Sequence, residues 1–423
     1  MRWLFKSAHI VDPGGPHHNK VRDVLVVDGM ITQVKATITA SKARTIKQAN
    51  LHLSPGWIDL KAHFQDPGAE YKEDLSSGLD AAAKGGFTGV VVMPSTDPPI
   101  DSKSGIEYML KRSASHPVKL LPVGTLSAKR EGKQLAELYD MHSNGAVAFS
   151  DDAPVDRTDL MNRALEYSKT FGGVVYSHPH EADLCPAGVM HEGIMSTQLG
   201  LKGIPDVAEI IRLSRDIDLL RYTRGRMHVA LISSAKSVEL IRRAKKEGLQ
   251  ITCGVSAYHL IFTDDDLHSF DSNFKVMPPL RSKADQQALI KGVKDGTIDV
   301  ICSDHKPENI EHKRVEFDLA AFGISGIETC FSAARTSLSN KEDLTRLIES
   351  LSHGPRRVLE MDIVHIEAGT SADLTAFDPD LKAILENDQI QSKSKNNPLI
   401  NRELTGQVIA VIRAEHCIRF DEA

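Results

Sequence analysis

This chain of 423 residues has no Cys-x-x-Cys pair, no excess of basic residues, few aromatic residues and no long apolar run. None of its five cysteines forms a Cys-x-x-Cys pair, and their odd number and scatter fit a reduced cytoplasmic protein better than a disulfide-bonded secreted one. Lys and Arg number 51 against 57 Asp and Glu, and aromatics make up only 5%, so we expect no nucleic-acid-binding surface. No run reaches the roughly 18 apolar residues of a membrane helix, and the opening residues contain no apolar run of signal-peptide length, so we expect no signal peptide. These absences favour a cytoplasmic globular protein that binds neither nucleic acid nor membrane.

Short apolar runs alternate with helix-like segments along most of the chain. Eight runs have the continuous apolar character of strands buried on both faces: 55–60, 89–93, 118–123, 146–149, 173–176, 227–232, 250–255 and 298–302. Helical spacing of apolar residues marks segments between them: 73–84, 235–246 and 285–294. The pattern predicts an α/β protein with a (β/α)8 TIM barrel over residues 55–354. A doubly wound open sheet is the architectural alternative.

Both ends of the chain have a different pattern. Residues 1–54 carry strand-like alternation with a hairpin signal at Asp28-Gly29, and residues 355–423 contain further strand-like segments. Neither end alone makes a sheet large enough to be stable. We therefore predict that 1–54 and 355–423 together form one small β-sandwich domain, with the polar stretch 390–397 as a loop.

Polar side chains follow several of the predicted barrel strands. The C-terminal ends of barrel strands form one mouth, where the chemistry of such folds is located. Histidines and carboxylates that converge there would suit a zinc site with nitrogen and oxygen ligands. The residues at these ends are Lys61, His63, Ser95, Asp151, Asp152, His178, His180, Leu231, Asp304 and His305.

Longer motifs resemble the dihydroorotases of the bacterial long-chain type, within the amidohydrolase superfamily. The similar segments run in order through nearly the whole chain: PGWIDLKAHFQDPG, GVVVMPSTDPP, AVAFSDDA, MSTQLGLKGIP, KVMPPLRS, CSDHKPE, FGISGIET and ADLTAFDP. The resemblance implies a barrel flanked by a β domain from both termini. It also implies two zinc ions, a bridging hydroxide that attacks a cyclic amide, and a strand-eight aspartate that transfers the proton.

Four residues match the ligands that the resemblance implies: His63, Asp151, His178 and Asp304. Asp304 also holds the family's proton-transfer position, and His305 beside it is expected in the substrate pocket. Other positions depart from the family. Lys61 replaces a histidine of the His-x-His motif, Leu231 replaces the strand-six histidine, Gln65 replaces a substrate-binding arginine, and Ser95 and Met277 replace asparagines.

These departures weaken both metal positions. One metal position loses a histidine and gains the Lys61 ammonium, which repels a dication. The other metal position also loses a histidine, because Leu231 offers no lone pair. A catalytic zinc generally keeps three protein ligands and a water. We therefore expect no zinc or only weakly bound zinc, and poor binding of a carboxylate-bearing ring by Gln65, Ser95 and Met277.

Three hypotheses on function follow. The leading one is a non-catalytic dihydroorotase-like protein of pyrimidine biosynthesis, because inactive paralogues of this family serve as structural partners of aspartate transcarbamoylase. The second is an active cyclic-amide hydrolase with one metal or none. The third is an active dihydroorotase in which another histidine, such as His180 or His259, has become a ligand. The family also suggests a symmetric homo-oligomer.

The lysine at position 61 suggests how the pocket tolerates the loss of metal. Two carboxylates gathered in a partly dry cleft repel each other, and an ammonium in place of the cation relieves this repulsion. We predict a salt bridge from Lys61 to Asp151 or Asp304, with the amine within roughly 4 Å of a carboxylate. The alternative is that the side chain extends into solvent and its charge has no effect.

Overall fold

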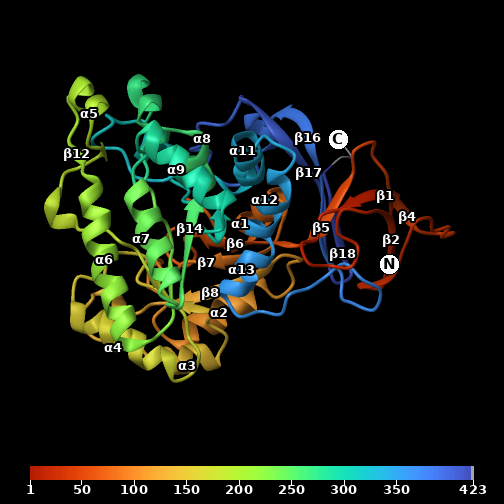
Figure 1. The fold of residues 1–423 in the computed structure, drawn as a ribbon, viewed down its shortest axis with the longest axis horizontal. Helices are drawn as coiled ribbons and strands as arrows, with labels where there is room; N and C mark the ends of the chain where they lie inside the picture. Colours follow the sequence, from red (N-terminus) through yellow and green to blue (C-terminus); the bar gives the residue numbers. More distant parts are fainter. Residues whose placement is uncertain (421–423) are drawn as a thin grey trace.

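A computed structural model of the chain describes residues 1–420. It contains a barrel of parallel strands surrounded by helices and a separate β-sheet that both ends of the chain share (Figure 1). No helix among residues 1–420 is long and apolar enough to cross a membrane.

All eight predicted barrel strands are present, in the hydrogen-bonded order β15-β14-β13-β10-β9-β8-β7-β6. Their bounds are Trp57–Ala62 (β6), Phe87–Val92 (β7), Lys119–Gly124 (β8), Ala148–Phe149 (β9), Val175–Ser177 (β10), Met227–Val229 (β13), Ile251–Ser256 (β14) and Val300–Cys302 (β15). The first and last strands meet through a parallel bridge between Ala62 and His305, and the His63 amide donates to the His305 carbonyl at 2.8 Å. This closure confirms the barrel and excludes the doubly wound open sheet.

Helices cover the outside of the barrel. Their bounds are Leu75–Lys84 (α1), Lys103–Ser113 (α2), Leu138–Ser143 (α3), Thr158–Lys169 (α4), Ile194–Leu199 (α5), Asp206–Thr223 (α6), Ala235–Lys246 (α7), Ala257–Ile261 (α8), Lys283–Lys294 (α9), Ile310–Lys313 (α10), Cys330–Ser337 (α11), Asp343–Leu351 (α12) and His353–Val358 (α13). The predicted helices correspond to α1, α7 and α9. Helix α1 begins after Asp74, whose carboxylate accepts from the Ser77 amide at 2.8 Å, and it ends before Gly85-Gly86.

Among residues 1–420, six short 3-10 helices and one small β pair lie in the loops, one of these helices between β16 and β17 of the β domain. The 3-10 helices are Ala128–Arg130, Ala182–Leu184, Asp264–Ser269, Ser272–Phe274, Ile327–Thr329 and Asn387–Gln389. The pair consists of Met190–His191 (β11) and Gly203–Ile204 (β12), which run parallel to each other.

The second sheet joins the two ends of the chain in the order β18-β17-β16-β5-β1-β2-β3, with β4 paired to β1. Its strands are Arg2–Ile10 (β1), Val21–Val27 (β2), Met30–Lys35 (β3), Arg44–Ile46 (β4), His52–Pro55 (β5), Asp373–Ile384 (β16), Glu403–Arg413 (β17) and His416–Arg419 (β18). Figure 1 shows the early strands β1, β2 and β5 beside the late strands β16, β17 and β18. The predicted Asp28-Gly29 turn is present, with φ of 48° and 79°, between β2 and β3.

Apolar packing connects the sheet to the barrel. The indole of Trp57, in β6, is fully buried and lies 4.6 Å from the ring of Phe331 in α11 and 5.4 Å from that of Phe377 in β16. The Arg356 side chain, in α13, donates to the Gly56 carbonyl at 2.7 Å and to Asp373 of β16 at 2.6 Å. The two parts therefore share a continuous core and a buried polar contact.

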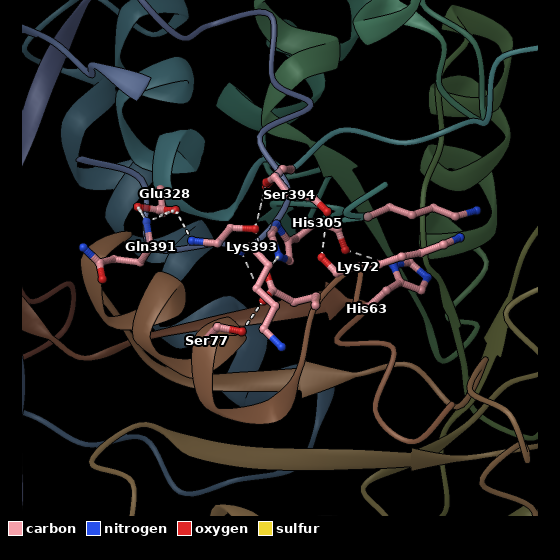
Figure 2. Close-up of polar contacts among 12 residues, drawn as sticks. His63, Lys72, Ser77, His305, Glu328, Gln391, Lys393 and Ser394 are labelled. Carbon is pink, nitrogen blue, oxygen red and sulfur yellow. Dashed lines mark hydrogen bonds and ion pairs between the residues drawn. The ribbon is translucent and has the colours of Figure 1, made fainter. Parts of the chain in front are cut away.

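The 390–397 segment, which leads from β16 to β17, is a loop as predicted, but it lies against the barrel. Ser392, Ser394, Asn396 and Asn397 are buried, whereas the odd-numbered residues from 391 to 395 are exposed. Ser394 donates to the Lys72 carbonyl at 2.7 Å, and the Gln391 amide donates to Glu328 at 3.1 Å (Figure 2). The β domain thus sends one segment back over the loops of the barrel mouth.

Candidate functional site

A pocket lies at the C-terminal ends of the barrel strands. It is the place where the sequence predicts the site. Its walls include cationic, acidic, imidazole and apolar side chains: Lys61, His63, Asp152, His178, His180, Glu209, Leu231, Met277, Arg281, Asp304, Lys306 and Phe322.

The Lys61 ammonium lies within this pocket, between two carboxylates. Its Nζ is 2.6 Å from Oδ1 of Asp304 and 3.4 Å from Oδ1 of Asp152, and the residue is only 5% exposed. Burial alone would lower the pKa of Lys61, but the charges of Asp304 and Asp152 outweigh it and raise that pKa above its ordinary value. The predicted salt bridge to Asp304 is confirmed, and the solvent-facing alternative is wrong.

The second carboxylate of the pocket is Asp152, and the prediction of Asp151 as a bridging ligand is corrected. The Asp151 carboxylate turns away from the pocket, where it accepts from the amides of Leu126 and Ser127 at 2.9 and 2.8 Å. Asp152 has a φ of 49°, and this left-handed turn of the backbone places its side chain in the pocket instead. Adjacent side chains point in opposite directions at this strand end, so a motif match alone does not show which of the two carboxylates enters the pocket.

Asp152 organises the polar cluster. Its Oδ2 lies 2.7 Å from Nε2 of His63 and accepts from the Ser95 hydroxyl at 2.7 Å, while its Oδ1 lies 3.3 Å from Nε2 of His178. Burial would raise the pKa of Asp152, but His63 and Lys61 hold it well below its ordinary value. The carboxylate therefore stays ionised as the common partner of Lys61 and the two imidazoles.

Both histidines that the sequence assigns as ligands lie at the pocket with existing polar neighbours. His63 uses Nδ1 toward the His305 carbonyl at 3.0 Å and Nε2 toward Asp152, so both ring nitrogens are engaged. His178 has Nδ1 3.3 Å from the Ser150 hydroxyl, and burial lowers its pKa. His63 offers no lone pair to a metal without giving up one of these contacts, whereas Nε2 of His178 is buried without a hydrogen-bond partner among the described residues.

Asp304, the residue at the family's proton-transfer position, is held by two donors. Its Oδ1 pairs with Lys61, and its Oδ2 accepts from the hydroxyl of Tyr258, a buried residue in helix α8, which follows β14. Burial would raise the pKa of Asp304, but Lys61 and His63 lower it overall. An ionised carboxylate with both oxygens occupied is a weak proton acceptor. Tyr258 is not among the predicted site residues, although it lies only three positions after the predicted strand 250–255.

The predicted substrate-pocket residues separate into two groups. Met277 and Leu231 line the pocket, and Ser95 reaches it through its bond to Asp152. Gln65 is not among the lining residues, and its backbone turns sharply, with a φ of 56°. The assignment of Gln65 to the pocket therefore does not hold in this structure.

His305 also lies outside the pocket, which corrects its predicted role. It is fully buried, its Nε2 is 3.5 Å from Oε2 of Glu73, and Figure 2 shows its ring grouped with Lys393 and Ser394. The physical reason is the same as at Asp151. Asp304 has a φ of 45°, so its own side chain enters the pocket while the next one points to the opposite side.

The alternative histidine ligands differ in position. His180 lines the pocket, and burial together with Arg281 lowers its pKa. His259 is fixed elsewhere, with Nδ1 2.6 Å from the Ser256 hydroxyl and Nε2 3.1 Å from the Pro278 carbonyl, and burial lowers its pKa to about 4. His259 therefore supports the loop and is not positioned as a metal ligand.

The side chains present do not fit the two-zinc centre that the resemblance implies. An ammonium stands between the two carboxylates that would bind the ions, Leu231 supplies no donor atom, and His63 is engaged at both nitrogens. A zinc ion needs at least three well-placed nitrogen, oxygen or sulfur ligands and no competing cation. What the cluster can do is hold fixed charges in a partly enclosed pocket.

Solved structures show how widely this fold occurs. The chain superimposes on an L-hydantoinase (dihydropyrimidinase) from Arthrobacter aurescens with a TM-score of 0.86, covering 99% of this chain and 96% of that one at 23% identity. It superimposes on a dihydropyrimidinase from Brevibacillus agri with a TM-score of 0.84, covering 100% and 96% at 20% identity. At such identities the likeness shows the fold alone.

Sequence relatives show the family. A model of dihydro-orotase-like proteins matches residues 51–237. The dihydroorotase of Acetivibrio thermocellus is 42% identical over 409 residues, which is 96% of each chain. The dihydroorotase of Carboxydothermus hydrogenoformans is 41% identical over 416 residues, or 97% of this chain and 96% of the relative. With this identity along almost the whole length, and with the barrel and the strand-end cluster in place, the chain belongs to the dihydroorotase family of amidohydrolases.

Proposed function

We propose that this chain is a non-catalytic member of the dihydroorotase family that acts through its shape and surface. The observation that carries the proposal is the position of the Lys61 ammonium, 2.6 Å from Asp304 and 3.4 Å from Asp152. It supplies positive charge where the family would hold metal ions.

The chemistry of amide hydrolysis explains why this position matters. A bound zinc ion lowers the pKa of water from about 15.7 to about 7, which makes hydroxide available at neutral pH. The Lys61 ammonium offers charge but no empty orbital, so it cannot bind and activate water in this way. Asp304, which would have to accept a proton, already bonds to Lys61 and Tyr258.

The partner proposed for this protein is aspartate transcarbamoylase, in the cytoplasm. Inactive dihydroorotase-like paralogues associate with that enzyme, and this supports the same role here. A symmetric homo-oligomer would let each chain offer the same surface to a symmetric partner.

The partner can be tested by mixing the purified chain with the aspartate transcarbamoylase of the same source. We expect co-migration on size-exclusion chromatography and a mass that fits a fixed stoichiometry. Separate elution at micromolar concentrations of both proteins would contradict the proposed partner without affecting the proposal of inactivity.

A second candidate is hydrolysis of a cyclic amide with fewer metal ions than the family uses, or with none. Two observations favour it. The relatives at about 40% identity are named dihydroorotases, and the pocket is lined by Arg281 and Lys306, which could bind an anionic ring. Under this hypothesis the substrate would differ from dihydroorotate, since Met277 and Leu231 give the pocket apolar walls.

Activity assays on matched variants distinguish these candidates. We expect no turnover of dihydroorotate by the natural chain with or without added zinc, and no turnover in a panel of hydantoins and dihydropyrimidines. The double variant Lys61→His, Leu231→His should bind metal in the pocket but remain far below family rates, because Ser95 and Met277 still replace substrate-binding groups. Turnover by the natural chain that disappears in Asp304→Asn would overturn the proposal. The Asp304→Asn control also separates activity of this pocket from a contaminating enzyme.

A further inference from the structure

A cluster of one carboxylate and two imidazoles lies away from the barrel mouth, where the β domain meets the barrel. Asp12 follows strand β1 of the β domain, His353 opens helix α13 of the barrel, and His365 lies in the connection to β16. One ligand atom from each residue lies within 4.8 Å of the other two. The start of the chain and a stretch in its C-terminal third therefore bring oxygen and nitrogen donors together.

The Asp12 carboxylate is fixed in this cluster. It is completely buried, and its Oδ2 accepts from the Ile366 amide at 2.8 Å. Its Oδ1 lies 2.9 Å from Nδ1 of His365 and 3.5 Å from Nε2 of His353. One oxygen is thus held by the backbone, and the other faces both imidazoles.

One nitrogen of the His353 ring has no hydrogen-bond partner in the cluster. The ring is 2% exposed, and Nε2 has no hydrogen-bond partner among the described residues. The backbone carbonyl of Val364 interacts with the same ring, and this contact falls to the other nitrogen, Nδ1. When the ring carries its proton on Nδ1, the lone pair of Nε2 faces Oδ1 of Asp12 at 3.5 Å, so two acceptors face each other.

We propose that Asp12, His353 and His365 bind a divalent transition metal ion of the zinc type that fastens the β domain to the barrel. An ion between the acceptors removes the conflict between the Nε2 lone pair and the carboxylate. The pairing of a ligand imidazole with a backbone carbonyl on its other nitrogen is the usual support of metal-binding histidines. Two imidazoles and a carboxylate suit zinc and its neighbours in the first transition row better than calcium or magnesium.

The surroundings leave room for entry and for a fourth ligand. The side chain of His365 is 29% exposed, so the site is open to solvent on one side. His17 is a candidate for the fourth position, because its Nδ1 is buried without a hydrogen-bond partner among the described residues and it lies within electrostatic reach of Asp12. A water molecule would otherwise complete the tetrahedron.

The test is zinc binding by the full chain after chelation and dialysis. We expect about one zinc ion per chain, with anomalous scattering at the zinc edge located between Asp12 and His353. Bound cobalt should give the visible absorption of a four-coordinate site. The variant His365→Ala should bind more than about 100-fold more weakly, because even the loss of a supporting residue around a metal costs 10- to 100-fold. Zinc should also raise the melting temperature of the natural chain by several degrees, and not that of the variant.

Two further variants make the result specific. His116→Ala removes a histidine outside the cluster, whose Nε2 lies 3.1 Å from Asp80 and whose Nδ1 accepts from the Val118 amide at 3.0 Å, and it should leave zinc binding unchanged. Asp152→Asn alters the barrel pocket and should also leave it unchanged. Absence of zinc from the natural chain, or equal binding by His365→Ala, would overturn this proposal. Zinc located beside Asp152 would instead count against the proposed function.

Discussion

A single lysine determines the electrostatics of the barrel mouth. Lys61 balances Asp152 and Asp304 in a place where unpaired carboxylates would be costly. We expect Lys61→Met, which keeps most of the volume, to reduce the free energy of unfolding by about 3 kcal/mol, because it leaves buried charge without compensation. Urea unfolding monitored by circular dichroism measures this change.

A surface lysine provides the matched control. Lys133 pairs with Glu131 at 3.0 Å, but its side chain is 72% exposed, so Lys133→Met should change the stability by less than about 1 kcal/mol. Equal effects of Lys61→Met and Lys133→Met would show that the buried cluster contributes nothing beyond a surface pair.

The same cluster predicts how stability depends on pH. The pKa values of Asp152 and Asp304 are lowered in the folded chain, so the unfolded chain takes up protons first as the pH falls. Their contribution is fully present above the unfolded pKa of about 3.9 and is lost as the pH falls below it. The raised pKa of Lys61 adds stability that is present below the unfolded lysine pKa of about 10.4 and is lost only when the pH rises through the folded value.

This pH dependence can be measured as urea midpoints between pH 6 and pH 3. We expect a shallower acid decline in Lys61→Met than in the natural chain, because without the ammonium the two pKa values are less depressed. Parallel curves for the two proteins would contradict the role assigned to Lys61.

Sequence patterns predicted single residues of the site incompletely. The salt bridge of Lys61 to Asp304 follows from charge and strand position, and both are readable in the sequence. The exchange of Asp151 for Asp152 and the outward turn of His305 depend on positive φ angles at Asp152 and Asp304, which are aspartates that favour no single conformation. Tyr258 was missed because a tyrosine after a strand has many structural roles.

At the scale of elements, the barrel strands were the most predictable part. Continuous apolar runs are buried on both faces, so their composition alone marks them, and all eight are found. The 390–397 segment shows the limit of such patterns. Its polarity correctly indicates a loop, but serines and asparagines that bond to a distant surface have the same composition as those that face water.

This segment carries a prediction of its own. The Asn397 side chain donates to the Ser325 carbonyl at 2.9 Å and to the Thr329 hydroxyl at 3.0 Å, and it accepts from the Leu399 amide at 2.8 Å. Asn397→Leu should cost about 2 to 3 kcal/mol, because it leaves buried polar groups without partners. Thermal or urea unfolding measures the loss, and faster proteolysis within 390–397 should accompany it.

A neighbouring exposed residue serves as the control for this segment. Lys395 contacts the Asn387 carbonyl at the surface, so Lys395→Ala should leave stability and proteolysis nearly unchanged. If Asn397→Leu behaves like Lys395→Ala, the segment is not held by its buried amides.

At the scale of the whole molecule, the two parts should unfold together. The chain has two tryptophans, and they report on different regions: Trp3 lies in the core of the β domain and Trp57 in the core that it shares with the barrel. The variants Trp3→Phe and Trp57→Phe each leave one reporter. We expect the fluorescence transition of each variant to coincide with its circular dichroism transition, because Phe377 and Arg356 connect the cores. Loss of the Trp3 signal at lower urea would show instead that the β domain unfolds independently.

The lysine at the barrel mouth has a consequence for how the protein meets its chemical environment. A metal centre exchanges with its surroundings, so its charge varies with the supply of each ion and it can be filled by the wrong one. The ammonium of Lys61 is part of the chain and is made whenever the chain is made. The positive charge of this pocket therefore comes from a residue of the chain and not from a bound ion. Neither scarcity of zinc nor excess of copper should alter it.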